Sequence, residues 1–430
     1  MRYTPASSSL FIQNREKLKA LLPHKGLAIL TSNAIMPTNA DGTMGFRQNS
    51  DLYYLSGIDQ EDTLLVVFPG AADPAYREIL FIRETSEEIA IWEGDKLTKA
   101  QAAEHSGVKT ILWSADFYKT LRGLMAEAQS VWLNSNEHTR ADIQIVTREM
   151  ELVHTLKQQY PLHQYQRLAP LMHQLRAVKS SEEIELIAHA CQITEKGFRR
   201  LLSFVKPGVT EYQIEAELIH EFISNRAEGF AYGPIIASGF NACVLHYHQN
   251  AKTCEAGELL LLDVAARYAN YASDLTRCIP VSGRFSPRQK AIYNAVLRVQ
   301  KQAIQTLKPG VILREFNQWV GQWMEKELVD LGLISMADIA SQNPAWPAYK
   351  KYFMHGTSHF LGLDVHDVGF FNEPLQAGMV LTVEPGIYVR EEGIGVRIEN
   401  NVVIQENGAP LDLMASIPRE VEELESLMNA

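Results

Sequence analysis

The sequence has few cysteines, no basic run and no long apolar run, and each absence argues against a class of protein. Four cysteines occur in 430 residues without the paired spacing of a cysteine metal site, and we interpret them as free buried thiols. No segment reaches the roughly 18 consecutive apolar residues that a membrane span needs. Residues 1–10 lack the apolar core of a signal peptide. We therefore expect a cytoplasmic protein with no membrane partner.

Positive charge is also in deficit. The chain has 40 Lys+Arg against 51 Asp+Glu, which gives a formal net charge of −11. A protein that binds nucleic acid through its phosphates normally presents a basic surface. We therefore expect no nucleic-acid partner.

Length and pattern together predict two domains. A chain of 430 residues exceeds the size at which a single hydrophobic core usually splits. In its first part, short apolar strands at 26–30, 63–68 and 78–82 alternate with amphipathic helical stretches. This alternation is typical of an α/β domain.

The boundary between the domains is placed from a change of pattern. A polar, glutamine-rich stretch at 157–166 is followed by Ser180-Ser-Glu-Glu, a capping box that predicts a long helix ending near Val205. We place the break near residue 172, so that the domains span residues 1–172 and 173–430.

The second domain contains acidic residues at the ends of apolar strands. The run Glu258-Leu-Leu-Leu-Leu-Asp263 predicts a buried strand, and a second strand follows at 271–279. If the chain reverses near Tyr268 and Ala269, Asp263 and Asp274 lie opposite each other on antiparallel strands. Two such carboxylates repel each other unless a cation lies between them.

A second acidic pair has the same layout. Glu384 follows the apolar run 379–383, and Glu399 lies in an alternating segment beyond the turn around Glu391. Each pair is preceded by an Ala-Gly dipeptide six to seven residues upstream of its first acid, and Lys-Pro-Gly-Val occurs before both, at 206–209 and 308–311. These repeats predict two related halves that each contribute one carboxylate hairpin.

Four acids in apolar strands are more informative together than singly. A lone strand carboxylate is usually solvated, because Asp and Glu are mostly exposed. Four buried carboxylates need partners, and cations are the simplest partners that explain the repeated pattern.

A cluster of histidines supplies an imidazole for the same site. His355 and His359 are four residues apart, but Gly356 and Gly362 argue against a regular helix, and Gly356 stands where a metalloprotease helix would carry glutamate. We therefore expect a loop or strand rim that presents several imidazoles. The predicted ligands for two divalent cations about 3.5–4 Å apart are Asp263, Asp274, His359, Glu384 and Glu399.

These residues resemble a known family, the Xaa-Pro aminopeptidases (aminopeptidase P) of the pita-bread metallopeptidases. The motifs that carry the resemblance are His246, Asp263, Asp274, His355-Gly-Thr-Ser-His359, Val365-His366-Asp367, Glu384-Pro-Gly and Arg397-Ile-Glu399. The segment from Phe46 to Gly57 also resembles the N-terminal domain of bacterial aminopeptidase P. The resemblance implies an N-terminal α/β domain, which covers the site and makes oligomer contacts, followed by a pseudo-symmetric pita-bread domain around a curved antiparallel sheet.

The resemblance also implies an activity, namely release of the N-terminal residue from peptides with proline in second position. Four carboxylates balance the charge of two divalent cations, and a bridging water that loses its proton becomes the nucleophile. Manganese is the cofactor that the family favours, although this ligand set also suits Co²⁺, Fe²⁺ or Zn²⁺. A homodimer or homotetramer is expected.

Roles for single residues follow from the resemblance. Glu384 is expected to act as general base, His366 and His246 to bind the substrate carbonyl or oxyanion, and His355 to support them. Arg397 is expected to orient the metal-binding carboxylates, against the alternative of an exposed salt bridge. The expected substrate-binding residues are Tyr232, Tyr388 and Trp92, the last of which could reach a neighbouring subunit's site.

Three alternatives remain open at the level of sequence. A prolidase would accept only Xaa-Pro dipeptides, whereas an aminopeptidase P cleaves longer Xaa-Pro peptides. Pita-bread domains also occur as binding modules without activity, although such modules usually lose their ligand residues. Creatinase-like C–N hydrolysis has no positive feature in this sequence.

Overall fold

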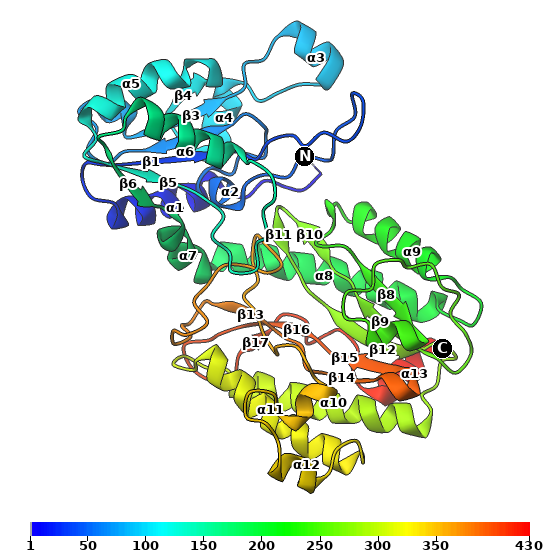
Figure 1. Cartoon of the computed structure of the whole chain (residues 1–430). Coiled ribbons are helices and arrows are strands. Elements are labelled where there is room, and N and C mark those ends of the chain that lie inside the picture. The colour runs from blue at the N-terminus through cyan, green and yellow to red at the C-terminus, as the bar shows by residue number, and fades with distance from the viewer. Residues whose placement is uncertain (1) are drawn as a thin grey trace. The chain divides into compact units, whose positions relative to one another are not determined.

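The structure, a computed structural model, describes residues 2–430 and divides the chain into two compact units (Figure 1). One unit comprises Pro5–Arg176. The other comprises Ala177–Ala430 together with the residues that precede Pro5. None of the helices in the described part is both long and apolar enough to cross a membrane.

The unit Pro5–Arg176 is built on a six-stranded sheet with the order β4-β3-β2-β1-β5-β6. The β1–β2 and β2–β3 pairs are antiparallel and the other three pairs are parallel. Its strands are β1 (Gly26–Thr31), β2 (Leu64–Val67), β3 (Glu78–Ile82), β4 (Thr110–Trp113), β5 (Ser130–Leu133) and β6 (Gln164–Arg167). The three strands predicted from apolar runs are therefore confirmed as β1, β2 and β3. All six residues of β1 are buried, because parallel and central strands are covered on both faces.

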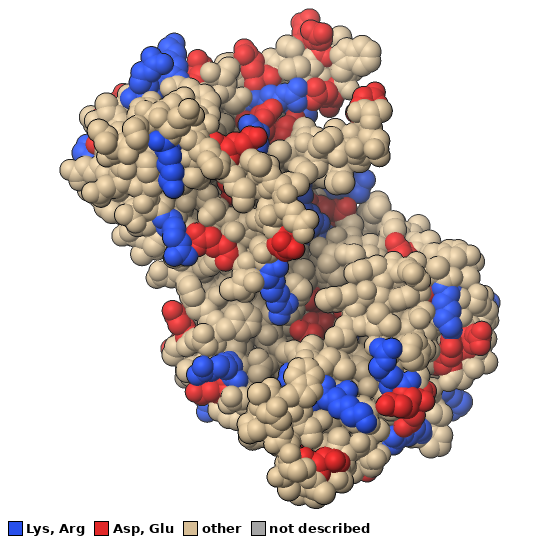
Figure 2. Space-filling view, in the orientation of Figure 1, with Lys and Arg blue, Asp and Glu red and all other residues tan. Residues whose placement is uncertain are grey.

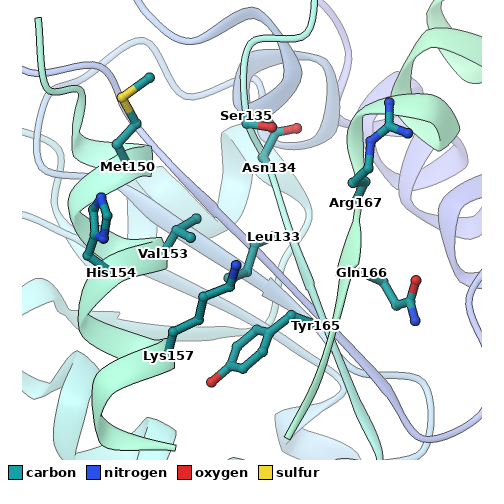
Figure 3. Close-up of a pocket in the computed structure, with 10 residues that line it drawn as sticks. All are labelled: Leu133, Asn134, Ser135, Met150, Val153, His154, Lys157, Tyr165, Gln166 and Arg167. Atoms are coloured by element: carbon teal, nitrogen blue, oxygen red, sulfur yellow. The ribbon is translucent and has the colours of Figure 1, made fainter. Parts of the chain in front are cut away.

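Seven α-helices accompany this sheet among the described residues. They are α1 (Ser8–Leu21), α2 (Ser50–Ser56), α3 (Glu87–Glu93), α4 (Lys99–Ser106), α5 (Phe117–Glu127), α6 (Arg148–Gln159) and α7 (Ala169–Ala177). The apolar faces of α5 and α6 pack with β1, β2, β3 and β5 into one core. A shallow pocket of about 280 Å³ lies between α6 and the edge strand β6, where Lys157 and Tyr165 face each other (Figure 3).

The unit that begins at Ala177 has two helix pairs on opposite sides of its strands (Figure 1). Its helices are α8 (Ser181–Phe204), α9 (Glu211–Ser224), α10 (Pro287–Thr306), α11 (Leu313–Asp330), α12 (Met336–Ala340) and α13 (Val421–Met428). The capping box predicted at Ser180 is present, with Glu183 closing it, and α8 ends one residue before Val205 as expected. The two Lys-Pro-Gly-Val segments precede α9 and α11, in agreement with two related halves.

The strands of this unit form short antiparallel sheets with the orders β11-β10-β7, β12-β9-β8, β13-β16-β17 and β14-β15. They are β7 (Gly229–Phe230), β8 (Ile235–Ser238), β9 (Leu259–Asp263), β10 (Ala266–Tyr268), β11 (Tyr271–Ala272), β12 (Thr276–Pro280), β13 (Val380–Val383), β14 (Gly386–Val389), β15 (Ile394–Arg397), β16 (Asn400–Val403) and β17 (Leu411–Asp412). The sheet β12-β9-β8 belongs to the half with α8 and α9. The sheet β13-β16-β17 belongs to the half with α10 and α11.

The register predicted for the first acidic hairpin is wrong. Asp263 pairs with Thr276 and not with Asp274. The reversal lies one residue later than predicted, at Ala269 and Asn270, which both have positive φ angles of 49° and 67°. A two-residue turn with both central φ angles positive has the twist that tight hairpins favour, and asparagine tolerates it well. Asp274 therefore lies two residues from the partner of Asp263.

The register of the second acidic hairpin is as predicted. Gly386 pairs with Arg397 in β14–β15, and Val383 pairs with Asn400 in β13–β16. Both ladders share one register, so Glu384 and Glu399 lie opposite each other between them. The turn closes on Gly393, whose φ of 63° lies in the left-handed region that glycine adopts at low cost.

Candidate active site

Four of the five predicted metal ligands lie at or next to strand ends in the unit that begins at Ala177, and the fifth comes from a loop. Asp263 is the last residue of β9, and Asp274 lies two residues before β12. Glu384 directly follows β13, and Glu399 lies between β15 and β16. His359 comes from the irregular segment before β13, so the prediction of a loop rather than a helix is confirmed. Strand ends from both halves thus supply the acids.

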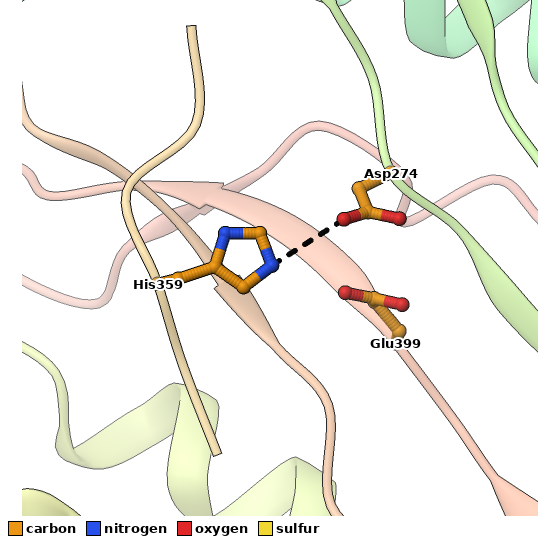
Figure 4. A group of neighbouring side chains, drawn as sticks. All are labelled: Asp274, His359 and Glu399. Atoms are coloured by element: carbon orange, nitrogen blue, oxygen red, sulfur yellow. Dashed lines mark ion pairs between the residues drawn. The ribbon is translucent and has the colours of Figure 1, made fainter. Parts of the chain in front are cut away.

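Three of these side chains form a compact group, shown in Figure 4. One ligand atom each from Asp274, His359 and Glu399 lies within 4.8 Å of the other two, and all three side chains are buried. The Nε2 atom of His359 is 3.4 Å from Oδ2 of Asp274 and 3.7 Å from Oε1 of Glu384. Glu384 therefore lies next to the group formed by Asp274, His359 and Glu399.

Asp263 joins the group through a tyrosine. The hydroxyl of Tyr232 is 2.6 Å from Oδ1 of Asp263 and 2.6 Å from Oδ1 of Asp274. A phenol has one proton, so it can donate to only one of these carboxylates at a time. The structure thus brings all five predicted ligands together, with Tyr232 in contact with two of them.

The donor set fits divalent cations. Glu399 is only 2% exposed, and its Oε1 atom has no hydrogen-bond partner within residues 2–430. A buried carboxylate oxygen without a partner is costly, and a cation bound among carboxylate and imidazole donors would satisfy it. The fit rests on this oxygen and on the closeness of the other donors.

The electrostatics point the same way. Burial raises the pKa of Asp263, with the charge of Asp274 adding to it and Arg397 opposing it. Burial also raises the pKa of Glu384 to about 7, and it raises the pKa of Glu399 well above its ordinary range, with neighbouring carboxylates adding to both. Each shift means that the protein alone disfavours the charged carboxylates, which positive charge would reverse.

The imidazole of His359 is oriented by its surroundings. Its Nδ1 atom is 2.9 Å from the carbonyl oxygen of Phe360, to which it donates, so that Nε2 faces the acids. Burial opposes ionisation of this ring, but the hydrogen bond with Asp274 and the charges of Glu384 and Asp274 raise its pKa.

Arg397 links the acids to the rest of the site. It donates from Nη2 to Oδ2 of Asp263 at 2.5 Å and from Nε to Oγ1 of Thr276 at 3.0 Å. The Thr276 hydroxyl donates to Oε2 of Glu399 at 2.6 Å. With 5% of its surface exposed, Arg397 is not an exposed salt bridge.

His355 is hydrogen-bonded to Tyr388. Nδ1 of His355 donates to the Gly356 carbonyl oxygen at 2.7 Å, and Nε2 accepts from the Tyr388 hydroxyl at 2.8 Å. Burial and the charge of Arg397 lower the pKa of His355 to about 3, so the ring is neutral. Tyr388 is 1% exposed and also accepts from Nη1 of Arg397 at 2.8 Å. It therefore lies behind the site rather than in an open pocket wall.

The other predicted residues are placed differently. The ring of His366 packs edge-on against His359 at 4.6 Å between centroids. His246 is exposed in the loop after β8, with its ring stacked 6.3 Å from that of His248. Trp92 lies on α3 in the other unit and is 83% exposed.

Sequence reasoning missed two supporting residues. Thr276, which connects Arg397 to Glu399, begins β12 two residues after Asp274. In the strand predicted over 271–279 this spacing places both residues on one face, which was a usable signal. Lys179 forms a fully buried ion pair with Asp367, next to His366, at 3.0 Å. No local pattern signals this pair, because the two residues are far apart in sequence.

A group of acids at strand ends, with an imidazole from a neighbouring loop and one buried carboxylate oxygen left without a partner, is typical of a metallohydrolase. Comparison with protein families agrees. The model for metallopeptidase family M24 matches residues 185–406, and the model for the aminopeptidase P N-terminal domain matches residues 11–132. The chain belongs to metallopeptidase family M24, and it is a hydrolase.

Similar proteins cover nearly the whole chain. A Xaa-Pro aminopeptidase of Haemophilus influenzae is 33% identical over 97% of this chain and 97% of its own, and one of Escherichia coli K12 is 34% identical over 98% and 97%. The low-pH form of E. coli aminopeptidase P is similar in structure, with a TM-score of 0.89 at 31% identity over 99% of both chains. The aminopeptidase PepP of Pseudomonas aeruginosa gives 0.88 at 32% identity over 100% and 99%.

These similarities confirm the predicted fold and the resemblance to aminopeptidase P, and they identify a metallo-aminopeptidase. They do not favour the prolidase alternative, and they give no support to an inactive binding module.

Proposed function

We propose that this chain releases the N-terminal residue from peptides that carry proline in second position. The observation that carries the proposal is the buried group of Asp274, His359 and Glu399, with an unpartnered oxygen on Glu399 and with the half-buried Asp263 and Glu384 beside it. The names of the similar proteins, Xaa-Pro aminopeptidases from several organisms, support the substrate class.

The residues that would hold two divalent cations are Asp263, Asp274, His359, Glu384 and Glu399. Bound cations would polarise the scissile carbonyl and lower the pKa of a shared water, so that a bridging hydroxide is available as nucleophile near neutral pH. Manganese is the proposed metal, and zinc is an alternative, since a zinc-substituted form of E. coli aminopeptidase P is among the similar structures.

The chain's own residues would bind, orient and move a proton. Oε2 of Glu384, 3.8 Å from Nδ1 of His355, would carry a proton to the leaving nitrogen. His366 and the exposed His246 would donate hydrogen bonds to the substrate carbonyl or to the oxyanion. Arg397 would hold Asp263 directly and Glu399 through Thr276, which fixes the ligand geometry.

The bond before proline is a tertiary amide without an N–H donor. A peptidase cleft that relies on strand pairing would lose a hydrogen bond there, so a site that binds the carbonyl through metal and imidazole suits this substrate. Tyr232 is better assigned to the carboxylates it contacts than to a substrate pocket. Trp92 remains a candidate for a neighbouring subunit's site, in a proposed cytoplasmic homodimer or homotetramer.

The test is release of the free N-terminal amino acid by the manganese-loaded protein, measured by chromatography. We expect Xaa-Pro-Xaa tripeptides to be cleaved faster than Xaa-Pro dipeptides, and Xaa-Ala-Xaa tripeptides to be cleaved poorly. Faster cleavage of the dipeptide would favour a prolidase. Equal cleavage of the alanine and proline tripeptides would overturn the proposed specificity.

A further inference from the structure

Glu211, the first residue of α9, is a completely buried carboxylate outside the metal group. It accepts four hydrogen bonds. Oε1 accepts from the backbone N–H and the hydroxyl of Ser238, both at 2.8 Å, and Oε2 accepts from the Tyr247 hydroxyl at 2.8 Å and the Lys252 N–H at 2.9 Å. A buried carboxylate needs this many donors to offset its lost hydration.

All four donors belong to one segment, residues 238–252, which carries His246. Ser238 ends β8, Lys252 lies near the far end of the segment, and Tyr247 follows His246 directly. Glu211 therefore forms hydrogen bonds with both ends of the segment and with its middle, and it holds all three at the first residue of α9.

Strand pairing does little to fix this segment. Beyond the short 3₁₀ turn at Gly239–Cys243 it has no helix or strand up to Ala251. A second acid of α9 adds to the anchor, since the Asn250 side chain donates to Oε2 of Glu215 at 3.0 Å. The conformation of the loop thus depends on side chains of α9.

The pattern of exposure shows which way the loop faces. Tyr247 is buried, with 8% of its surface exposed, whereas its neighbours His246 and His248 are both exposed. With the phenol of Tyr247 held by Glu211, the imidazoles on either side of it lie at the surface.

We propose that Glu211 is a positioning residue for His246, acting through the hydroxyl of Tyr247. This inference rests on the function proposed above, in which His246 donates a hydrogen bond to the substrate carbonyl or oxyanion. Glu211 touches neither substrate nor metal ligand. Its role is to keep the loop in the one conformation that presents His246.

The first test is Tyr247→Phe in the manganese-loaded enzyme, which removes one donor and keeps the ring. We expect kcat on an Xaa-Pro-Xaa peptide to fall about 10-fold, with KM changed less than about 2-fold and metal content unchanged. Tyr293→Phe is the matched control, because it removes a buried hydroxyl that donates to the Arg419 carbonyl elsewhere in the same unit. We expect this control to keep kcat within about 2-fold.

A double-mutant cycle separates positioning from a general loss of structure. In a His246→Ala background, Tyr247→Phe should lower kcat by less than about 2-fold, because its effect passes through the missing imidazole. The same loss in both backgrounds would overturn the proposal. Glu211→Gln should behave as Tyr247→Phe does, with a larger loss, since it disturbs two acceptor sites.

Hydrogen exchange gives a readout that does not depend on activity. Backbone amides of residues 244–252 should exchange faster in metal-loaded Tyr247→Phe than in the parent protein, whereas those of β9 should not change. Unchanged exchange at 244–252 would overturn the anchoring. If the parent protein cleaves no Xaa-Pro-Xaa peptide, the proposed function fails, and the exchange comparison still decides whether Glu211 anchors this loop.

Discussion

At the scale of single residues, the site is a set of charges that the protein alone does not balance. Burial and mutual repulsion raise the pKa values of Asp263, Glu384 and Glu399, and Arg397 offsets only part of this. Groups that are destabilised in the metal-free protein are stabilised when cations bind, so metal affinity and folding stability are linked.

The first prediction concerns Glu399. Manganese should raise the melting temperature of the parent protein, by the equivalent of about 2.7 kcal/mol at a metal concentration 100 times Kd. Glu399→Gln should lose most of this increase and, in EDTA, should melt no lower than the parent, because one repelling carboxylate is gone. Calorimetry with and without metal measures both effects. The control is Glu422→Gln, an exposed acid paired with Lys290, which should respond to metal as the parent does.

The second prediction concerns Glu149 on α6, whose pKa burial and the charge of Asp51 raise to about 7. Between the ordinary pKa near 4.5 and about 7 the folded state binds more protons than the unfolded state, so stability falls as pH rises through this window. Glu149→Gln keeps the oxygen that accepts from Asn49 and Asn134 and removes the charge. It should therefore be more stable than the parent at pH 8, by at most about 3 kcal/mol, with no advantage at pH 4.

Thermal melts of both proteins at the two pH values test this. Glu151→Gln, an exposed acid in the same helical turn, is the matched control. A stabilisation by Glu149→Gln that is as large at pH 4 as at pH 8 would contradict the linkage.

At the scale of helices and strands, the residues in the turns determine whether the register of a hairpin can be predicted from the sequence. The strands, the capping box of α8 and the register of the second hairpin follow from local patterns, and Gly393 marks that turn. The first hairpin was misplaced by one residue because Ala269 gives no sign that it adopts a positive φ angle. The acids and His359 were still found, since strand ends place them in the same region in either register. The supporting contacts of Glu211 were beyond prediction, because each depends on tertiary packing.

Lys179 and Asp367 give the prediction at this scale. Their buried ion pair connects Lys179, the residue before the N-cap of α8, to the loop that carries His366. The surroundings of Asp367 are tightly packed, since a Cβ atom on Gly362 would come within 2.2 Å of its Oδ2 atom. Lys179→Met removes the cation that lies 3.0 Å from the buried Asp367 carboxylate and should cost about 3–5 kcal/mol in the free energy of unfolding. Lys179→Met combined with Asp367→Asn should recover much of that loss, because the carboxylate charge that the lysine balanced is removed as well. Denaturant unfolding of the three proteins measures this, and a double variant as unstable as the single one would contradict it.

At the scale of the whole molecule, two features are relevant to function, namely the distribution of surface charge and the presence of two similar halves. Lys and Arg side chains are interspersed with Asp and Glu side chains over the face shown in Figure 2. The two halves of the unit that begins at Ala177 each contribute an acid-bearing hairpin, and the acids meet in one group. Neither half alone contains all of the proposed ligands, so bound cations would couple the stabilities of the two halves.

The last prediction follows from this division. Removing metal with EDTA should increase hydrogen exchange in β9 and β12 of one half and in β13 and β16 of the other to similar extents, because the proposed cations would be held by acids from both halves. The sheet strands β1, β2 and β3 belong to the other compact unit and supply no ligand, so their exchange should stay the same. They act as an internal control within one experiment. Increased exchange in only one half would mean that the metal belongs to that half alone, and increased exchange in β1–β3 would mean that metal stabilises the chain as a single cooperative body.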